Sequence, residues 1–174
     1  SVNSLTRQLG DAEWKHLDDT VYGGDFLAHQ PPVKEMTEWA PRIIDLMDRM
    51  GVTFNRTAEG FRDQRRFGGT LYPRTAFAGA TTGQQLLYAL DEQVRRWEEH
   101  GHVTKYEFWD YLGPILDDQG VCRGCVAQDM VTMEIRAFPA DALVIASGGC
   151  GLLYGRSTMS MACTGSAASR TFQA

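Results

Sequence analysis

The stretch from Arg74 to Arg96, RTAFAGATTGQQLLYALDEQVRR, constrains the fold more than any other part of the sequence. From Thr82 onward its apolar residues recur at helical spacing with charged residues opposite them, which predicts an amphipathic helix. Thr81 or Thr82 can cap this helix, and Gly101 can end it. A surface helix needs no more than that, so the Arg-Thr pair and the run of small residues before it need a further explanation.

The composition describes an acidic protein with enough apolar residues for one domain. The chain has 174 residues, a hydrophobic fraction of 43% and a net charge of −5. Nucleic acid is not expected as a partner, because phosphate binding needs clustered Lys and Arg, and acidic residues flank both basic clusters here. No apolar run approaches the ~18–20 residues of a membrane span and no signal peptide is visible, so a membrane role would come through a partner. The first residue is not Met and the last residues read as an unfinished helix, which we interpret as a piece of a larger polypeptide.

Three prolines predict helix boundaries in the first part of the chain. Pro31 and Pro32 suit the start of a helix, and Pro41 predicts the end of one short helix and the start of a second. The following residues, 52–69, are expected to be irregular or hairpin-like.

The second part of the chain predicts strands. Three alternating or apolar segments, 103–117, 121–129 and 131–138, are separated by turn residues and indicate an antiparallel meander. The uninterrupted apolar run at 143–146 fits a strand that is buried on both faces and followed by a glycine turn. The expected fold is therefore α/β with α+β elements: helices, an antiparallel β-meander and a buried parallel strand.

Two stretches could let a ligand approach the backbone closely. ASGGCG (146–151) follows the predicted buried strand, and ligands of doubly wound sheets lie at such carboxyl ends, although a strand that merely turns sharply would look the same. STMSMACTGSAAS (157–169) could place hydroxyl groups and backbone amides around phosphate or sugar oxygens at the start of a helix. Taken alone, that second stretch is better explained as a capped helix packed through Ala and Ser.

The four cysteines do not predict a metal site. Cys122 and Cys125 form one C-x-x-C, but Cys150 and Cys163 are thirteen residues apart and no His lies near any of them. We interpret the first pair as small apolar strand residues and do not expect a redox disulfide in what looks like a cytosolic protein. The histidines are scattered, and the Asp pairs at 18–19 and 117–118 are interpreted as turn and cap residues.

Four longer motifs resemble one family when they are taken in order. They are DDTVYGGDFLAHQPPVKEM, APRIIDLMDRMGVTFNRTAEG, RRFGGTLYPRTAFAGATTGQQLLYALDEQVRR and ALVIASGGCGLLYGRSTMSMACTGSAAS. They resemble the flavoprotein subunit of succinate dehydrogenase and fumarate reductase, most closely the Gram-positive form, over nearly the whole chain. The resemblance implies that residues 1–174 are part of a Rossmann-like FAD-binding domain, between the flavin-attachment loop and the substrate-capping domain. The small residues before the helix at Thr82 would then lie under the flavin region and let the backbone approach the cofactor.

The resemblance also implies which residues contact FAD. VIASGG matches the family's Ala-Thr-Gly-Gly signature, where a strand meets the flavin cofactor, and one meander residue falls where the family offers its backbone to the adenine end. A third set matches the loop and helix start near the flavin and its ribityl chain. The residues carried over in this way are Tyr111, Ala146, Ser147, Gly148, Thr158, Thr164, Gly165 and Ser166.

Several family motifs are missing from this sequence. It contains neither the G-x-G-x-x-G fingerprint, nor the loop whose His carries the flavin covalently, nor the substrate-binding motifs, so no catalytic residue is assigned. Met159 and Cys163 stand in place of two family Asn residues, LYPR replaces a more polar turn, and Cys125 replaces an aliphatic residue. These departures put local flavin contacts in question rather than the family.

The function implied for the whole subunit is the FAD-dependent interconversion of succinate and fumarate, with electrons passed to an iron–sulfur subunit and quinone. A membrane-anchor subunit would then hold it peripherally at the cytoplasmic face of the bacterial cell membrane. Two alternatives stay open: a non-catalytic assembly or binding module derived from the same domain, and an L-aspartate oxidase-like flavoprotein, which shares the RT…A…TG preamble. As a fragment of the subunit, the isolated segment is expected to be inactive, to expose apolar surface and to be poorly stable.

Overall fold

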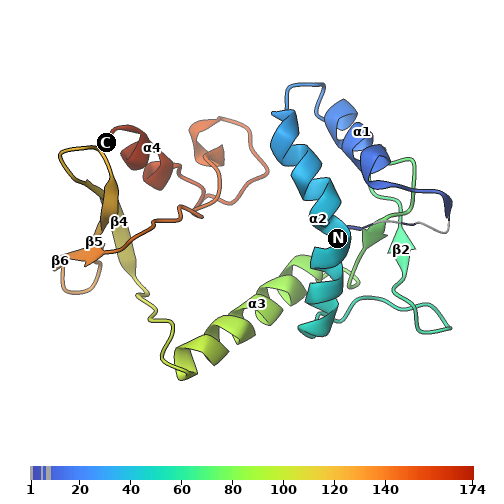
Figure 1. Cartoon of the computed structure of the whole chain (residues 1–174), viewed down its shortest axis with the longest axis horizontal. Coiled ribbons are helices and arrows are strands. Elements are labelled where there is room, and N and C mark those ends of the chain that lie inside the picture. The colour runs from blue at the N-terminus through green and yellow to red at the C-terminus, as the bar shows by residue number, and fades with distance from the viewer. Residues whose placement is uncertain (1, 5, 7–8) are drawn as a thin grey trace. The chain divides into compact units, whose positions relative to one another are not determined.

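The computed structural model describes residues 2–4, 6 and 9–174, and the chain divides into two compact units (Figure 1). Unit 1 is Ser1–Thr104 and unit 2 is Lys105–Ala174. Unit 1 contains, in chain order, β1 (Val2–Asn3), α1 (Glu13–Gly23), α2 (Gln30–Arg49), β2 (Gln64–Arg65), β3 (Thr75–Ala76) and α3 (Thr82–Glu99). Unit 2 contains β4 (Trp109–Leu116), β5 (Cys122–Asp129), β6 (Ile135–Pro139), the 3₁₀ turn η2 (Gly151–Leu153) and α4 (Ser166–Phe172).

Unit 1 is built around a small antiparallel sheet and the helices that flank it. The strand order is β1-β3-β2, and Ala76 of β3 is in register with both Val2 and Gln64. α1 packs along α2 beside this sheet (Figure 1). Apolar side chains from α2, the segment after it, β3 and α3 form the core: Ile44, Val52, Phe54, Ala76 and Ala89, with Met47, Met50 and Leu86 packed against them.

α2 is one continuous helix, so the prediction that Pro41 ends one helix and starts another is wrong. Pro41 lies inside α2, whereas Pro31 and Pro32 lie in its first turn, as predicted. A proline in a helix removes only one backbone hydrogen bond, the one to the carbonyl four residues earlier. Thr37, Ala40 and Ile44 bury the same face of α2 on both sides of Pro41, and this shared burial holds the two halves together.

The helix predicted from Thr82 is present as α3. Thr81 is its N-cap residue, and the chain leaves it through His100 and Gly101. Its apolar stripe is largely uncovered, as expected for this segment on its own: Leu87, Leu90, Val94 and Trp97 remain 39–65% exposed. No helix within residues 2–4, 6 and 9–174 is both long enough and apolar enough to cross a membrane.

The antiparallel meander is confirmed, with the strand order β4-β5-β6. Its first strand begins at Trp109, six residues later than the predicted segment. Carboxylates fix both turns: Asp117 Oδ1 accepts the backbone amides of Gln119 and Val121 (3.0 and 2.9 Å), and Asp129 plays the same part in the second turn. The prediction that Asp117 is a turn residue is therefore confirmed.

The buried parallel strand predicted over 143–146 is not formed in this structure. Val144 is 84% exposed and Ile145 is 37% exposed, and none of the strands in the described part of the chain pairs with this segment. A strand needs a neighbouring strand for its backbone hydrogen bonds and cover on both faces for its side chains, and residues 143–146 have neither here. The α+β class itself is confirmed by the helices and antiparallel sheets.

Candidate functional site

Residues 146–166, called the glycine loop below, carry seven of the eight residues that the sequence assigns to a cofactor. The loop follows the meander, contains η2 and ends where α4 begins. Five of its residues are glycines, at positions 148, 149, 151, 155 and 165, and most of the remaining side chains are short. The backbone of the loop is therefore more accessible than that of the helices or the meander.

Two parts of the glycine loop cross in contact with each other. The amide of Leu152 donates to the carbonyl oxygen of Cys163 at 3.1 Å. Gly148 (φ +77°) and Gly165 (φ +75°) both adopt the left-handed conformation that favours glycine. A Cβ at position 165 would lie 2.7 Å from Cys150 Cβ, and one at position 148 would lie 3.8 Å from Cys163 Sγ. The structure thus brings together the predicted residues Gly148 and Gly165, which are far apart in the loop.

The predicted hydroxyl residues next to this crossing are open to solvent. Thr164 Oγ1 accepts the backbone amide of Ser166 at 3.3 Å and lies 3.2 Å from Ser166 Oγ. Thr164 and Ser166 are exposed, as are Ala146 and Ser147 on the other segment. Short, exposed side chains on two crossing backbone segments can accept a large polar ligand without steric conflict. Thr158 lies apart from them, in an open hollow lined by residues 155–158.

Met159 fills space against the glycines rather than serving as a polar contact. A Cβ at Gly149 would collide with Met159 Cε, and one at Gly151 would lie 2.6 Å from Met159 Cβ. Met159 also lines a 150 Å³ hollow together with Met161 and the backbone around Gly151. At this position, where the family pattern has Asn, the chain therefore uses van der Waals packing to hold the loop.

Tyr111 of β4 is joined to the glycine loop through α4. Its hydroxyl lies 3.0 Å from Thr171 Oγ1, and its carbonyl oxygen accepts a hydrogen bond from Arg170. Arg170 Nη1 also contacts Asp110 Oδ2 at 2.9 Å. The backbone carbonyl of Tyr111, which was predicted to contact the cofactor, thus already accepts a hydrogen bond from Arg170. No sequence motif had indicated a role for Arg170.

A second polar site lies in unit 1, and sequence reasoning missed its geometry. Arg74 is completely buried and makes two hydrogen bonds to Asp11, with Nε–Oδ2 at 2.9 Å and Nη2–Oδ1 at 2.8 Å. Its Nη1 contacts Asp19 Oδ2 at 2.5 Å. Asp19 is a helical residue of α1, so its interpretation as a turn or cap residue is wrong. Arg74, which precedes β3, therefore ties α1 to that strand through a buried group of charges. This group, made of Arg74, Asp11 and Asp19, is called the Arg74 cluster below.

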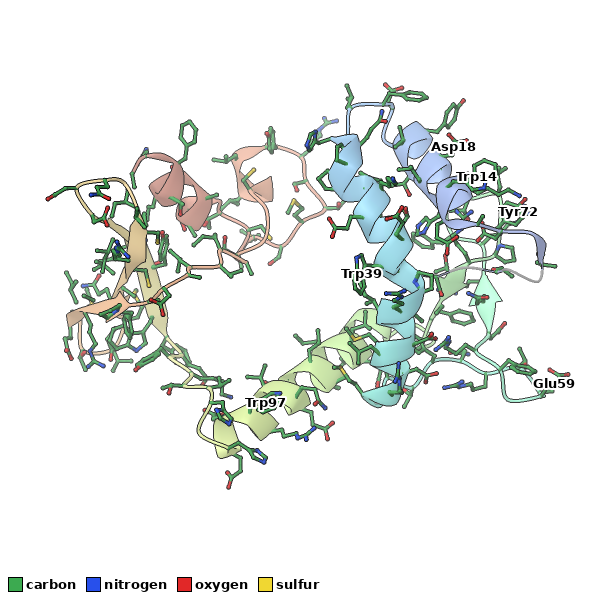
Figure 2. The ribbon with its side chains drawn as sticks, viewed as in Figure 1. Trp14, Asp18, Trp39, Glu59, Tyr72 and Trp97 are labelled. Carbon is green, nitrogen blue, oxygen red and sulfur yellow. The ribbon has the colours of Figure 1, made fainter. Side chains whose placement is uncertain are left out.

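Aromatic rings border the Arg74 cluster. The guanidinium of Arg74 lies 5.7 Å from the centre of the Tyr72 ring, and Lys15 Nζ lies 4.8 Å from the same ring. Lys15 also lies 5.4 Å from the Trp14 ring, and Figure 2 shows Trp14 and Tyr72 beside each other at α1. Tyr72 thus lies against the guanidinium of Arg74, whereas Trp14 is 64% exposed.

The Arg74 cluster sets the ionisation of its members. Burial alone would raise the pKa of Asp11, but hydrogen bonds from Arg74 and from the Thr6 amide, with the charge of Arg74, hold that pKa below its ordinary value. His16 is 2% exposed, and its pKa is lowered chiefly by burial and then by Arg74, against the opposite effect of Asp11 and Asp19. The neutral ring of His16 is therefore favoured, and its Nδ1 has no hydrogen-bond partner within the described residues.

The cysteines are free thiols. Among residues 2–4, 6 and 9–174, no group of three or more His, Cys, Asp or Glu side chains is placed to hold a metal ion. The glycine loop thus presents backbone groups, hydroxyl groups and two free thiols, and unit 1 contains a buried ion cluster.

Comparison with known proteins connects this geometry to a family. A family described as FAD binding domain matches residues 2–174. The succinate dehydrogenase flavoprotein subunit of Bacillus subtilis is 64% identical over 168 residues, which are 97% of this chain and 29% of that subunit. A fumarate reductase flavoprotein subunit of Mycobacterium tuberculosis is 32% identical and covers 92% of this chain and 27% of its own length. Escherichia coli quinol fumarate reductase matches the structure with a TM-score of 0.84 at 30% identity, over 95% of this chain and 28% of that chain. The chain thus spans less than a third of each of these relatives.

Proposed function

The chain belongs to the FAD binding domain family, and on that premise we propose that it is an internal segment of the flavoprotein subunit of a succinate dehydrogenase or fumarate reductase. The observation that carries the proposal is the 64% identity to the Bacillus subtilis succinate dehydrogenase flavoprotein subunit, which extends over 97% of this chain. In the whole subunit a bound FAD would supply the redox chemistry between succinate and fumarate, and the protein would position it.

The glycine loop would hold part of that cofactor. Gly148 and Gly165 lie on segments that cross, with short exposed side chains around them, and this is the kind of surface that lets a backbone approach a dinucleotide. Ala146 and Ser147 would extend the contact along one segment, and the exposed hydroxyls next to Gly165 would donate to polar oxygens of the ligand. These hydroxyls belong to Thr164 and Ser166, and Thr158 would add a third from the open hollow.

Tyr111 would contribute from the meander with its backbone. Because its carbonyl oxygen already accepts from Arg170, a contact with the adenine end would have to use the second lone pair or the neighbouring amide. Arg170 would then act as a positioning residue that sets the distance between β4 and α4.

The remaining parts of the function concern the whole assembly. We propose that the subunit interconverts succinate and fumarate and passes electrons to an iron–sulfur subunit and on to quinone. A membrane-anchor subunit would hold it peripherally at the cytoplasmic face of the bacterial cell membrane. Support comes from relatives named as flavoprotein subunits of succinate dehydrogenase and fumarate reductase.

A decisive experiment uses the full-length subunit that contains this segment, purified with its partners. We expect it to contain flavin at about one per subunit and to reduce an artificial electron acceptor when succinate is added. Flavin that stays with the protein after acid precipitation would indicate covalent attachment, which the family resemblance implies lies outside this segment.

The same preparation separates the alternatives. Oxidation of L-aspartate in place of succinate would contradict the proposal in favour of an L-aspartate oxidase-like enzyme. A protein of the size of this chain that carries no flavin would instead identify an assembly or binding module. As a matched control, malonate, a dicarboxylate that lacks the carbon–carbon bond to be oxidised, should inhibit the reaction with succinate without being consumed.

A further inference from the structure

Two crossing segments of the glycine loop carry Cys150 and Cys163, which are thirteen residues apart in the sequence. Cys163 contacts the chain on both sides of Cys150: its carbonyl accepts the Leu152 amide at 3.1 Å, and its Sγ lies 3.8 Å from the Cβ position of Gly148. In the other direction, Cys150 Cβ lies 2.7 Å from the Cβ position of Gly165, which follows Cys163 by two residues. The two cysteines therefore lie on segments that cross.

The surroundings of this pair permit a covalent bond. Both side chains are free thiols, and neither is fully buried in this segment. A disulfide needs Cβ atoms about 3.5–4.5 Å apart, and any remaining adjustment would fall on a backbone rich in glycine. Gly148, Gly149 and Gly151 surround Cys150, and a glycine backbone adapts at a lower steric cost than any other residue.

We propose that Cys150 and Cys163 are a redox-reactive pair that a peroxide converts into a disulfide, which ties residues 148–152 to residues 163–165. In the first step the thiolate of one cysteine attacks a peroxide oxygen, the O–O bond breaks, and a sulfenic acid forms with release of water or an alcohol. In the second step the other thiol attacks the sulfenic sulfur, the S–S bond forms and water leaves. The two cysteines lose two electrons in total, and the peroxide gains them.

The C-x-x-C pair offers a contrast within the same unit. Cys122 and Cys125 are opposite Leu116 and Pro114 in the β4–β5 ladder, so the ladder fixes their Cα atoms about 6.6 Å apart, near the upper end of the range found in disulfides. Cys122 Sγ lies 3.6 Å from the carbonyl oxygen of Gly124, and burial, followed by the proximity of Cys122, raises the pKa of the Cys125 thiol. A less available thiolate in a rigid strand reacts more slowly. The pair that sequence spacing favours is thus the one that we expect to stay reduced.

Peptide mapping of the full-length subunit tests the proposal directly. The protein is purified with reductant, treated with hydrogen peroxide, blocked with N-ethylmaleimide and digested with trypsin without reductant. Trypsin cleavage places each cysteine on its own fragment, namely 106–123, 124–136, 137–156 and 157–170. We expect fragments 137–156 and 157–170 to be joined after peroxide and separated by dithiothreitol, with the other two fragments alkylated.

Two variants complete the test. Cys163→Ser should abolish the joined fragment, whereas Cys122→Ser should leave it unchanged. Full alkylation of fragments 137–156 and 157–170 after peroxide would overturn the proposal, and so would the joining of fragments 106–123 and 124–136. Sulfinic acid on either cysteine without a joined fragment would overturn it as well.

One consequence rests on the proposed function, because Gly148 and Gly165 are proposed flavin contacts. The visible absorption spectrum of the same samples should then shift on oxidation and return with dithiothreitol. An unchanged spectrum together with a joined fragment would keep the disulfide and remove the flavin contact, so the two ideas fail separately.

Discussion

The Arg74 cluster and the glycine loop solve opposite physical problems. In the cluster, a completely buried guanidinium is matched by two carboxylates, and each of its nitrogen atoms contacts Asp11 or Asp19. In the glycine loop, most residues are exposed, the side chains are short, and contacts are made by backbone atoms and sulfur-bearing side chains. A buried charge requires a partner from its own chain, whereas an exposed backbone is free to bind something else.

The same difference separates the Arg-Thr pair before α3 from the predicted cofactor residues. Arg74 and Thr75 are 0% and 1% exposed, and the guanidinium of Arg74 donates its hydrogen bonds to Asp11 and Asp19 of unit 1. The glycine loop has no charged residue except Arg156, and all seven of its predicted residues are at least partly open to solvent.

The largest expected effect follows from removing the charge at the centre of the Arg74 cluster. Arg74→Ala would leave Asp11 and Asp19 without their partner, and breaking a buried ion pair costs about 3–5 kcal/mol. We expect the free energy of unfolding of the full-length subunit to fall by that amount in urea titrations. The matched control is Arg95→Ala on α3, because Arg95 pairs with Asp91 in an exposed position and such pairs contribute less than about 1 kcal/mol. Equal losses in the two variants would contradict the view that burial makes the difference.

A smaller effect is expected from adding one methyl group to the glycine loop. Gly165→Ala would place a Cβ 2.7 Å from Cys150 Cβ in a left-handed backbone conformation, at a cost of about 1–3 kcal/mol. Because this strain would separate the crossing segments, we expect a lower flavin-to-protein ratio in the purified subunit.

Gly23→Ala, at the end of α1, is the control for this prediction. A Cβ at Gly23 meets nothing within 4 Å, so the flavin-to-protein ratio should remain that of the unmodified protein. If both variants retained flavin equally, the crossing of the two segments would not matter for the cofactor.

The smallest effect concerns acid stability. The folded-state pKa of His16 lies below the ordinary value of 6.5, so the unfolded chain takes up this proton first and stability falls as the pH drops below about 6.5. The depressed pKa of Asp11 acts in the same direction, but only when the pH falls below its ordinary value of 3.8. Urea titrations of the full-length subunit between pH 7.5 and about 5 should therefore show a loss of at most about 1.4 kcal/mol per pH unit from His16.

A His16→Gln variant tests how much of this pH dependence comes from His16. In this variant the free energy of unfolding should change less with pH over that range, whereas His29→Gln, at an exposed position, should leave the pH dependence unchanged. An unchanged slope in His16→Gln would assign the acid sensitivity to other groups.

Much of the fold could be read from local patterns. The helix at Thr82, the start at Pro31 and Pro32 and the three meander strands were predicted, because periodicity and turn chemistry act within a few residues. Predictions that required knowledge of distant neighbours were wrong: α2 continues through Pro41 because both halves bury one face, and residues 143–146 form no strand because no described strand pairs with them.

The candidate sites show the same division between what local sequence patterns determine and what tertiary contacts determine. By itself the sequence determined the family, the helical and meander elements, and the small and hydroxyl-bearing residues on which the proposed cofactor contacts rest, because these depend on residue type and order. Only the tertiary structure decided that Arg74 is matched by Asp11 and Asp19, and that the segments carrying Cys150 and Cys163 cross. Ion pairs and crossing segments depend on distances between parts of the chain that folding brings together, and no local pattern encodes those distances.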